Sequence, residues 1–483
     1  MVLFFKKGLG ILKIYNTITR QKEEFVPKEP KNDIKIYTCG QTVYNDIHIG
    51  NARFYVIFDT LRRFLKHEYP HCEIKFVQNF TDIDDKIIQR AEEENQSATE
   101  IAEKYISRTL EDLKDLNVEP ATVAPCATQE IEEIKAMVLE LINQGFAYEN
   151  NGTVYYSVSS FSEYGKLSKK NIEELKAGAR IEVEGNKRDP MDFVLWKPRK
   201  TDTEPAWDSP WGKGRPGWHI ECSAMARKYL GDEIDIHGGA TDLIFPHHEN
   251  EIAQTEALTG KPFSRFWMHC GILTKEHKKI SKSRGNFETF REVRERFPVD
   301  VIRFYLLSGH YRMPLEFTDE SLTAAQVGLT RIKTCVKNLE HAIAKEPEYK
   351  PSTTPDDPQI SMLQHYKELF FEAMRDDFNT ADAITAIFEM VKYINIQENN
   401  NLSTEFRIES IRMINFLMDI LGIDLEKENE KEQDNSQIES LINKRQEARK
   451  NKDFAQADQI RNQLTEMGII LEDTREGIRW HRI

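Results

Sequence analysis

Short apolar runs alternate with helical patterns in the first third of the chain. Residues 34–39 (IKIYTC) and 73–78 (EIKFVQ) are typical of buried strands, because each is a short, mainly apolar run. A helical pattern from about Ile49 to Lys66 separates these strands, and a further helical pattern begins at Asp84. The strand–helix–strand order predicts an α/β fold with a doubly wound parallel sheet.

The pattern of apolar, charged and turn-forming residues changes near residue 126. Asn151-Gly152 predicts a tight hairpin, and a charged, turn-rich stretch continues to about residue 206. We interpret this part as an insertion into the first domain. Residues 207–270 then return to a strand-and-loop pattern with many Gly, His and Trp residues.

The second half of the chain is mainly helical. Amphipathic patterns predict an α-helical bundle, an acidic stretch without apolar period predicts a linker, and the C-terminal residues predict a small α+β domain of two helices and a hairpin. The expected segments are 1–125, 126–206 and 207–270 for the α/β domain with its insertion, 271–325 for a connecting region, 326–423 for the bundle, 424–436 for the linker and 437–483 for the last domain.

Composition excludes some classes of protein. A chain of 483 residues is too long for one ordinary core, and 39% hydrophobic with 30% charged residues is typical of a globular protein. No apolar run reaches the roughly 20 residues that a membrane helix needs, so we expect no membrane partner. The net charge of −14 disfavours broad nucleic-acid binding unless basic patches are local.

Six cysteines are scattered along the chain, and the N-terminus lacks a secretory pattern because Lys6 and Lys7 follow the apolar residues. These features predict a cytoplasmic protein whose cysteines are free thiols or metal ligands.

Two polar strings suit phosphate chemistry. His48-Ile-Gly-Asn51 opens a predicted helix, whose N-terminal N–H groups and dipole attract phosphate. Lys279-Ile-Ser-Lys282-Ser is a small-residue loop whose cations suit a triphosphate. Taken alone, a histidine at an ordinary helix start is the favoured interpretation of the first string, and an exposed basic loop explains the second equally well.

Four side chains form a candidate metal site. His247 and Glu251 are four residues apart, so they share a face if the segment is helical, and Cys39 and Cys222 supply thiols. By chemistry His248 could equally be a ligand. Buried thiols and a polar helix face are the alternative, because the spacing matches no common zinc finger.

The order of these strings is similar to that of class I aminoacyl-tRNA synthetases, whose signatures are usually written HIGH and KMSKS. This chain departs from them at Asn51 and Ile280. Four longer strings resemble the cysteinyl-tRNA synthetase family from about Leu12 to the C-terminus: Tyr37–Tyr44, Thr81–Lys86, Gly214–Met225 and Phe245–Glu251.

The resemblance implies a Rossmann-like catalytic domain, and it implies roles for particular residues. The zinc ligands, for one Zn²⁺ per chain, would be Cys39, Cys222, His247 and Glu251. ATP, accompanied by Mg²⁺, would be bound by His48, Gly50, Asn51, Gly239, Asp242 and Lys282. Cysteine would be bound by Thr81, Trp218 and His237. Catalysis would rest on His48, Lys279 and Lys282. Trp218 could instead be a core aromatic residue, and Asp242 a helix cap.

A zinc ion gives a reason for the cysteine specificity. Shape discriminates poorly between cysteine and serine, whereas zinc prefers a thiolate to a neutral hydroxyl. We therefore expect the substrate thiolate to bind zinc, and the short insertion at 126–206 agrees with the absence of an editing domain.

The resemblance also implies the partners tRNA(Cys), ATP and L-cysteine, with residues 271–325 contacting the tRNA stem and 437–483 the anticodon; we expect a monomer. In the C-terminal segment, Arg479-Trp480-His481-Arg482 offers stacking and charge to RNA.

Three other functions are compatible with parts of the sequence. Transfer of cysteine to a small amine is disfavoured by the C-terminal unit. A non-catalytic RNA-binding protein is disfavoured by the intact phosphate-handling residues. Charging of another amino acid is disfavoured by the paired cysteines.

Overall fold

The computed structural model describes residues 10–28, 33–170, 187–202, 204–275, 278–279, 287–345, 358–398, 402–426, 441–442, 444–446, 448–449, 453–466, 469–474 and 477–482. The chain divides into two compact units, Met1–Ile423 and Asp424–Ile483.

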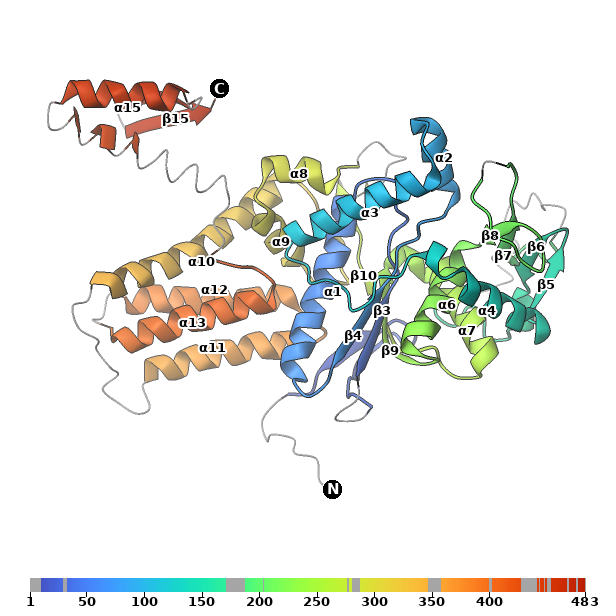
Figure 1. Ribbon diagram of the computed structural model, residues 1–483. Coiled ribbons are helices and arrows are strands. Elements are labelled where there is room, and N and C mark those ends of the chain that lie inside the picture. The colour runs from blue at the N-terminus through green and yellow to red at the C-terminus, as the bar shows by residue number, and fades with distance from the viewer. Residues whose placement is uncertain are drawn as a thin grey trace. The chain divides into compact units, whose positions relative to one another are not determined.

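A four-stranded parallel sheet forms the centre of the first unit. Its strands, in spatial order, are β10 (Ser264–Cys270), β9 (Ile234–Ala240), β3 (Ile34–Thr38) and β4 (Ile74–Gln78). Figure 1 shows α1 (Ile49–Glu68) on one side of the sheet, and α6 (Trp218–Leu230) with α7 (Glu249–Thr259) on the other. Helices on both faces confirm the predicted doubly wound α/β fold.

The sheet contains one reversal of strand order. From β3 the chain passes through α1 to β4, and it later returns to β9 on the opposite side of β3. In open parallel sheets, ligands bind beyond the carboxyl ends of the strands at such a switch point. Cys39 follows β3 directly, and His237 and Gly239 lie on β9, so three predicted site residues lie at this point.

A second sheet belongs to the insertion. It is antiparallel, and its strands are β5 (Ala147–Asn150), β6 (Thr153–Tyr156), β7 (Phe193–Pro198) and β8 (Gly214–Pro216). Asn151 and Gly152 both have positive φ, 53° and 80°, as the hairpin turn predicted there requires. Strand β8 lies beyond residue 206, within the segment that the sequence pattern assigned to the catalytic domain.

Helices dominate the rest of the first unit. Before the insertion sheet come α2 (Asp85–Glu94), α3 (Ala98–Asp115), η1 (Ala127–Gln129) and α4 (Ile131–Asn143), and η2 (Val158–Ser160) follows β6. Single turns η3 (Thr241–Leu243) and η4 (Ile244–His248) precede α7. After the sheet come α8 (Phe290–Arg296), α9 (Val299–Leu307), α10 (Asp319–Lys345), α11 (Pro358–Arg375), α12 (Thr380–Gln397) and α13 (Thr404–Ile420).

Short strands complete this unit. They are the hairpin β1 (Lys13–Asn16) with β2 (Gln21–Glu24), and the three-stranded group β11 (Leu273–Lys275), β12 (Lys278–Lys279) and β13 (Leu315–Glu316). All six cysteines lie in described residues, and none forms a disulfide there. In the part of the chain that the structure covers, no helix combines the length and apolarity needed to cross a bilayer.

The second unit contains α15 (Phe454–Glu466) and an antiparallel hairpin of β14 (Ile469–Thr474) and β15 (Gly477–Arg482). Ile442, Ile460, Leu464 and Ile469 form its small core. The hairpin was predicted from the sequence. Gly468, expected to end the helix, lies outside the described residues.

Arg303 joins the helical bundle to α1. Its side chain is 1% exposed and donates to Asp59 Oδ2 at 2.5 Å and to the carbonyls of Leu421 at 2.7 Å and Leu116 at 2.8 Å. A buried guanidinium whose donors all find acceptors holds the joined elements in one geometry.

We expect Arg303→Ala to lower the free energy of unfolding by about 3 kcal/mol, because removing one member of a buried ion pair leaves the other members without compensation. Urea unfolding followed by tryptophan fluorescence measures this. Arg412→Ala is the matched control, since Arg412 pairs with Glu409 but its side chain is 75% exposed. Equal losses in both variants would contradict this role.

Candidate active site and metal cluster

A cavity of about 260 Å³ opens beyond the carboxyl ends of the parallel strands. Its walls come from the turn between β3 and α1, from the segment after β9 and from the segment after β10. The cavity brings together six of the residues predicted from sequence: Cys39, His48, Gly50, Asn51, Trp218 and Asp242. Thr81, His237 and Gly239 are not among its described lining residues.

His48 is the N-cap of α1, as predicted for the HIGN string. Its Nδ1 accepts a hydrogen bond from the backbone N of Asn51 at 3.1 Å, and Asn51 Oδ1 accepts from the backbone N of His48 at 3.2 Å. The first turn of α1 contains no acidic residue. The positive end of the helix dipole therefore faces the cavity without a neutralising carboxylate on the helix itself.

The segment after β3 lies against the segment after β4. Gly40 N donates to Asn79 Oδ1 at 2.9 Å, and a Cβ at Gly40 would lie 1.5 Å from the carbonyl oxygen of Asn79, so only glycine fits there. Thr81 is buried and donates to Glu221 Oε2 at 2.9 Å. Thr81 thus reaches the residue that precedes Cys222.

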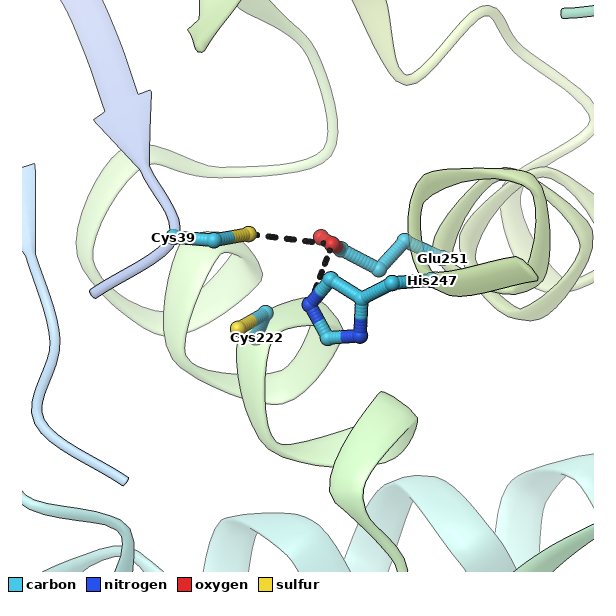
Figure 2. A group of neighbouring side chains, drawn as sticks. All are labelled: Cys39, Cys222, His247 and Glu251. Carbon is cyan, nitrogen blue, oxygen red and sulfur yellow. Dashed lines mark hydrogen bonds and ion pairs between the residues drawn. The ribbon is translucent and has the colours of Figure 1, made fainter. Parts of the chain in front are cut away.

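Four predicted metal ligands converge behind the cavity. The ligand atoms of Cys39, Cys222, His247 and Glu251 lie within 4.8 Å of one another, and all four residues are buried. Figure 2 shows the carboxylate of Glu251 between the thiol of Cys39 and the ring of His247, both at 3.1 Å. Cys222 comes from α6, whereas His247 and Glu251 lie on either side of the start of α7.

Burial and mutual contact shift the pKa values of this cluster. Burial alone would raise the pKa of Glu251, but His237 and His247 hold it well below its usual value. Burial would lower the pKa of His247, but Glu251 and Cys222 raise it to about 10. Burial raises the pKa of Cys39. Burial would also raise the pKa of Cys222, but the hydrogen bonds of Cys222 with Cys39 and His247 lower its pKa to about 6.

These shifts describe an anionic site. The directions of these shifts favour a carboxylate at Glu251 beside a protonated His247 ring 3.1 Å away, so the ring proton supplies positive charge next to a buried anion. A divalent cation could replace that proton, because metal binding deprotonates its ligands. Two thiols, an imidazole and a carboxylate are also donors that zinc accepts. The residues present therefore fit a metal ion.

A second set of donors overlaps the first. Cys39 and Glu251 also lie within 4.8 Å of His237 and His248. His237 Nε2 is 2.8 Å from Glu251 Oε2, and its ring stacks on Trp267 with centroids 4.4 Å apart. The geometry leaves His248 open as an alternative ligand, as the sequence did, but this second set contains only one of the two thiols.

Other buried partners were not found from the sequence. His219 Nδ1 lies 2.9 Å from His247 Nδ1. His248 Nδ1 lies 2.8 Å from His269 Nε2, and His269 Nδ1 lies 2.8 Å from Thr17 Oγ1. These contacts join segments that are far apart in the chain, so no local spacing indicated them. Only the many histidines of residues 207–270 gave a signal.

Two more predicted residues lie against the cluster. Trp218 lines the cavity, is 38% exposed and stacks on His247 with ring centroids 4.3 Å apart. A Cβ at Gly239 would lie 2.3 Å from Cε1 of His248, so the glycine permits close packing of that ring. Trp218 therefore separates His247 from the cavity, and Gly239 leaves room for the ring of His248.

The lysine string is described only in part. The backbone of Lys279 lies in β12, which pairs with β11, but its side chain lies outside the described residues, as do Ile280 and Lys282. Five residues after the end of this string, the carbonyl of Glu288 accepts a hydrogen bond from Ile49 N at 3.1 Å. The segment that follows the string is thus bonded to the start of α1.

Three known protein families match this chain. The class I (C) tRNA synthetase catalytic domain matches residues 25–327, the DALR domain matches residues 369–426, and the cysteinyl-tRNA ligase anticodon binding domain matches residues 435–480. The three matches follow one another along the chain.

Close relatives cover the whole length. A cysteine–tRNA ligase of Lachnoclostridium phytofermentans is 54% identical over 98% of this chain and 100% of its own length. That of Clostridioides difficile is 50% identical over the same shares.

Among solved structures, methionyl-tRNA synthetase of Mycobacterium tuberculosis bound by methionyl-adenylate matches with a TM-score of 0.63 at 15% identity, covering 80% of this chain and 92% of that one. A putative arginyl-tRNA synthetase of Campylobacter jejuni matches with a TM-score of 0.58 at 14% identity, covering 83% and 96%. These structures share the fold.

We expect the purified protein to hold one metal ion per chain, and Cys222→Ala to lose it because a thiolate ligand is removed. Elemental analysis gives both the amount and the element. His248→Ala should keep the metal, and Cys335→Ala, at a buried cysteine in α10, is the matched control. Metal loss in the His248 variant with retention in the Cys222 variant would assign the second donor set instead.

Proposed function

This chain belongs to the cysteine–tRNA ligase family, so its activity is the ATP-dependent attachment of cysteine to tRNA, and we propose that a zinc ion in its buried cluster selects the substrate thiol. The observation that carries the proposal is the convergence of Cys39, Cys222, His247 and Glu251 within 4.8 Å at the end of the cavity. Cys39 belongs both to this cluster and to the cavity wall.

The donor set suits selection of cysteine over serine. When bound, zinc supplies a soft Lewis acid that prefers a thiolate to a neutral hydroxyl. The protein residues position that site: Trp218 stacks on His247, and His219 bonds the other ring nitrogen. Such outer partners fix the orientation of a ligating imidazole. Thr81 and His237 would hold the remaining groups of cysteine or its adenylate.

The α1 end of the cavity suits ATP. Backbone N–H groups at a helix N-terminus bind phosphate, and Gly50 lets the nucleotide approach the backbone. His48 and Asn51 line the same wall, and Asp242, across the cavity, would bind the ribose. Gly239 belongs to the stretch that holds the adenosine. Mg²⁺ would accompany the phosphates.

The reaction follows in two steps. The cysteine carboxylate attacks the α-phosphorus of ATP and releases pyrophosphate, giving cysteinyl-adenylate. The terminal ribose hydroxyl of the tRNA then attacks the adenylate carbonyl and releases AMP. His48, Lys279 and Lys282 stabilise the charge that develops on the phosphates in the first step. No protein nucleophile is needed, because positioning and electrostatics supply the catalysis.

The second unit would bind the anticodon of tRNA(Cys). Its hairpin pairs Trp480 with Leu471 in register. An aromatic residue between arginines in the sequence offers stacking and charge to unpaired bases. We further propose that the enzyme is cytoplasmic and that it works as a monomer. Light scattering on the purified protein would test the monomeric state.

We expect ATP–pyrophosphate exchange that depends on cysteine and not on serine. Lys282→Ala should lower its rate about a hundredfold, because one charge-stabilising group is lost. Lys392→Ala, at an exposed pair with Glu389 in the bundle, is the control and should exchange normally. No exchange by metal-loaded protein would refute the activity, and equal exchange with serine would remove the proposed role of the metal.

A further inference from the structure

The start of α1 contains a reciprocal pair of hydrogen bonds between His48 and Asn51. His48 has the extended backbone of an N-cap, with φ −85° and ψ 164°. Its Nδ1 accepts from the backbone N of Asn51, and Asn51 Oδ1 accepts in return from the backbone N of His48. This is the arrangement of a capping box, with a histidine in the place of Ser or Thr and an asparagine in the place of Glu or Gln.

The first of these bonds defines the protonation of the ring. An imidazole nitrogen that accepts a hydrogen bond carries no proton, so His48 is neutral and its proton lies on Nε2. The positive end of the α1 dipole acts in the same direction, because it disfavours an imidazolium. His48 is therefore a hydrogen-bond donor through Nε2 rather than a cation.

Two further contacts fix the position of the ring. A Cβ at Gly50 would lie 2.9 Å from both Nδ1 and Cε1 of His48, so the ring occupies the space that any other residue at position 50 would fill. Phe287 packs edge-on against the same ring, with centroids 5.4 Å apart and an interplanar angle of 73°. His48, Gly50 and Phe287 all line the cavity.

We propose that the Asn51 side chain is a positioning group: by holding the backbone N of His48, it keeps Nδ1 of the ring in place to accept from the Asn51 backbone N, and so keeps His48 as the Nε2–H tautomer. The proposal rests on the function proposed above, in which His48 donates to those phosphates. A donor held in place before the substrate binds needs no reorganisation during the reaction. The Asn51 side-chain oxygen is already bonded on the helix itself, a role that needs an acceptor and no positive charge.

The test uses three variants of the full-length enzyme. Asn51→Ala removes the acceptor for the backbone N of His48 but keeps the backbone N–H that donates to the ring, so it loosens the position of the ring without removing its partner. Asn51→Gln is the conservative control, since capping boxes place Gln at this helix position. Gly50→Ala displaces the ring while leaving Asn51 in place. Long-range ¹H–¹⁵N spectra of histidine-labelled protein report the tautomer of His48, whose signals are assigned by their loss in His48→Gln.

We expect an Nε2–H tautomer for His48 in the wild-type and Asn51→Gln proteins. Asn51→Ala and Gly50→Ala should show mixed tautomers, and their kcat in cysteine-dependent ATP–pyrophosphate exchange should fall about tenfold, since small displacements of a catalytic group are costly. The KM for ATP should change little in Asn51→Ala.

Three results would overturn the proposal. The first is a wild-type His48 that is protonated on Nδ1. This result would count against the proposal even if every variant failed to fold. The second is an Asn51→Ala variant with an unchanged tautomer and a raised KM for ATP, which would assign Asn51 to phosphate contact. The third is an Asn51→Ala variant with wild-type kcat. Absence of exchange in the wild-type enzyme would instead refute the proposed function, because the tautomer is measured without turnover.

Discussion

The burial of Glu251 is the constraint on which the site depends. Its carboxylate is completely shielded from solvent, and a buried anion costs several kcal/mol unless opposite charge and hydrogen bonds compensate it. Here the compensation comes from His237, His247 and the thiol of Cys39. His237 lies on β9, Cys39 directly follows β3, and His247 lies in η4 before α7, so the cluster forms only when the parallel sheet domain is folded.

The sheet topology explains how distant residues meet. The chain reverses its strand order at β3 and β9, which brings Cys39 and His237 next to each other although the whole insertion lies between them in sequence. The same switch point places the N-terminus of α1 beside the cluster. One cavity therefore has a helix start suited to phosphate on one wall and a candidate metal-binding group of side chains behind another, an arrangement that would serve the proposed activation of cysteine by ATP.

The sequence predicted the local parts of this arrangement. Apolar periodicity identified β3, β4 and α1, and Asn-Gly identified the hairpin, because these signals act within a few residues. The start of α10 at Asp319 lay outside the predicted bundle, since its first turn is polar and has little apolar period. The bonds of Thr81 with Glu221 and of His269 with Thr17 depend on tertiary packing, which local patterns do not encode. The four ligand types came from family resemblance, and the structure brings them together.

We propose that the substrate thiolate binds a zinc ion held by Cys39, Cys222, His247 and Glu251, and one measurement tests this directly. X-ray absorption at the zinc edge counts the sulfur atoms bound to the metal, with and without substrate. We expect two sulfur ligands in the free enzyme, a third when cysteine is added, and no increase with serine. An unchanged sulfur count on saturation with cysteine would show that the substrate thiolate does not bind the metal.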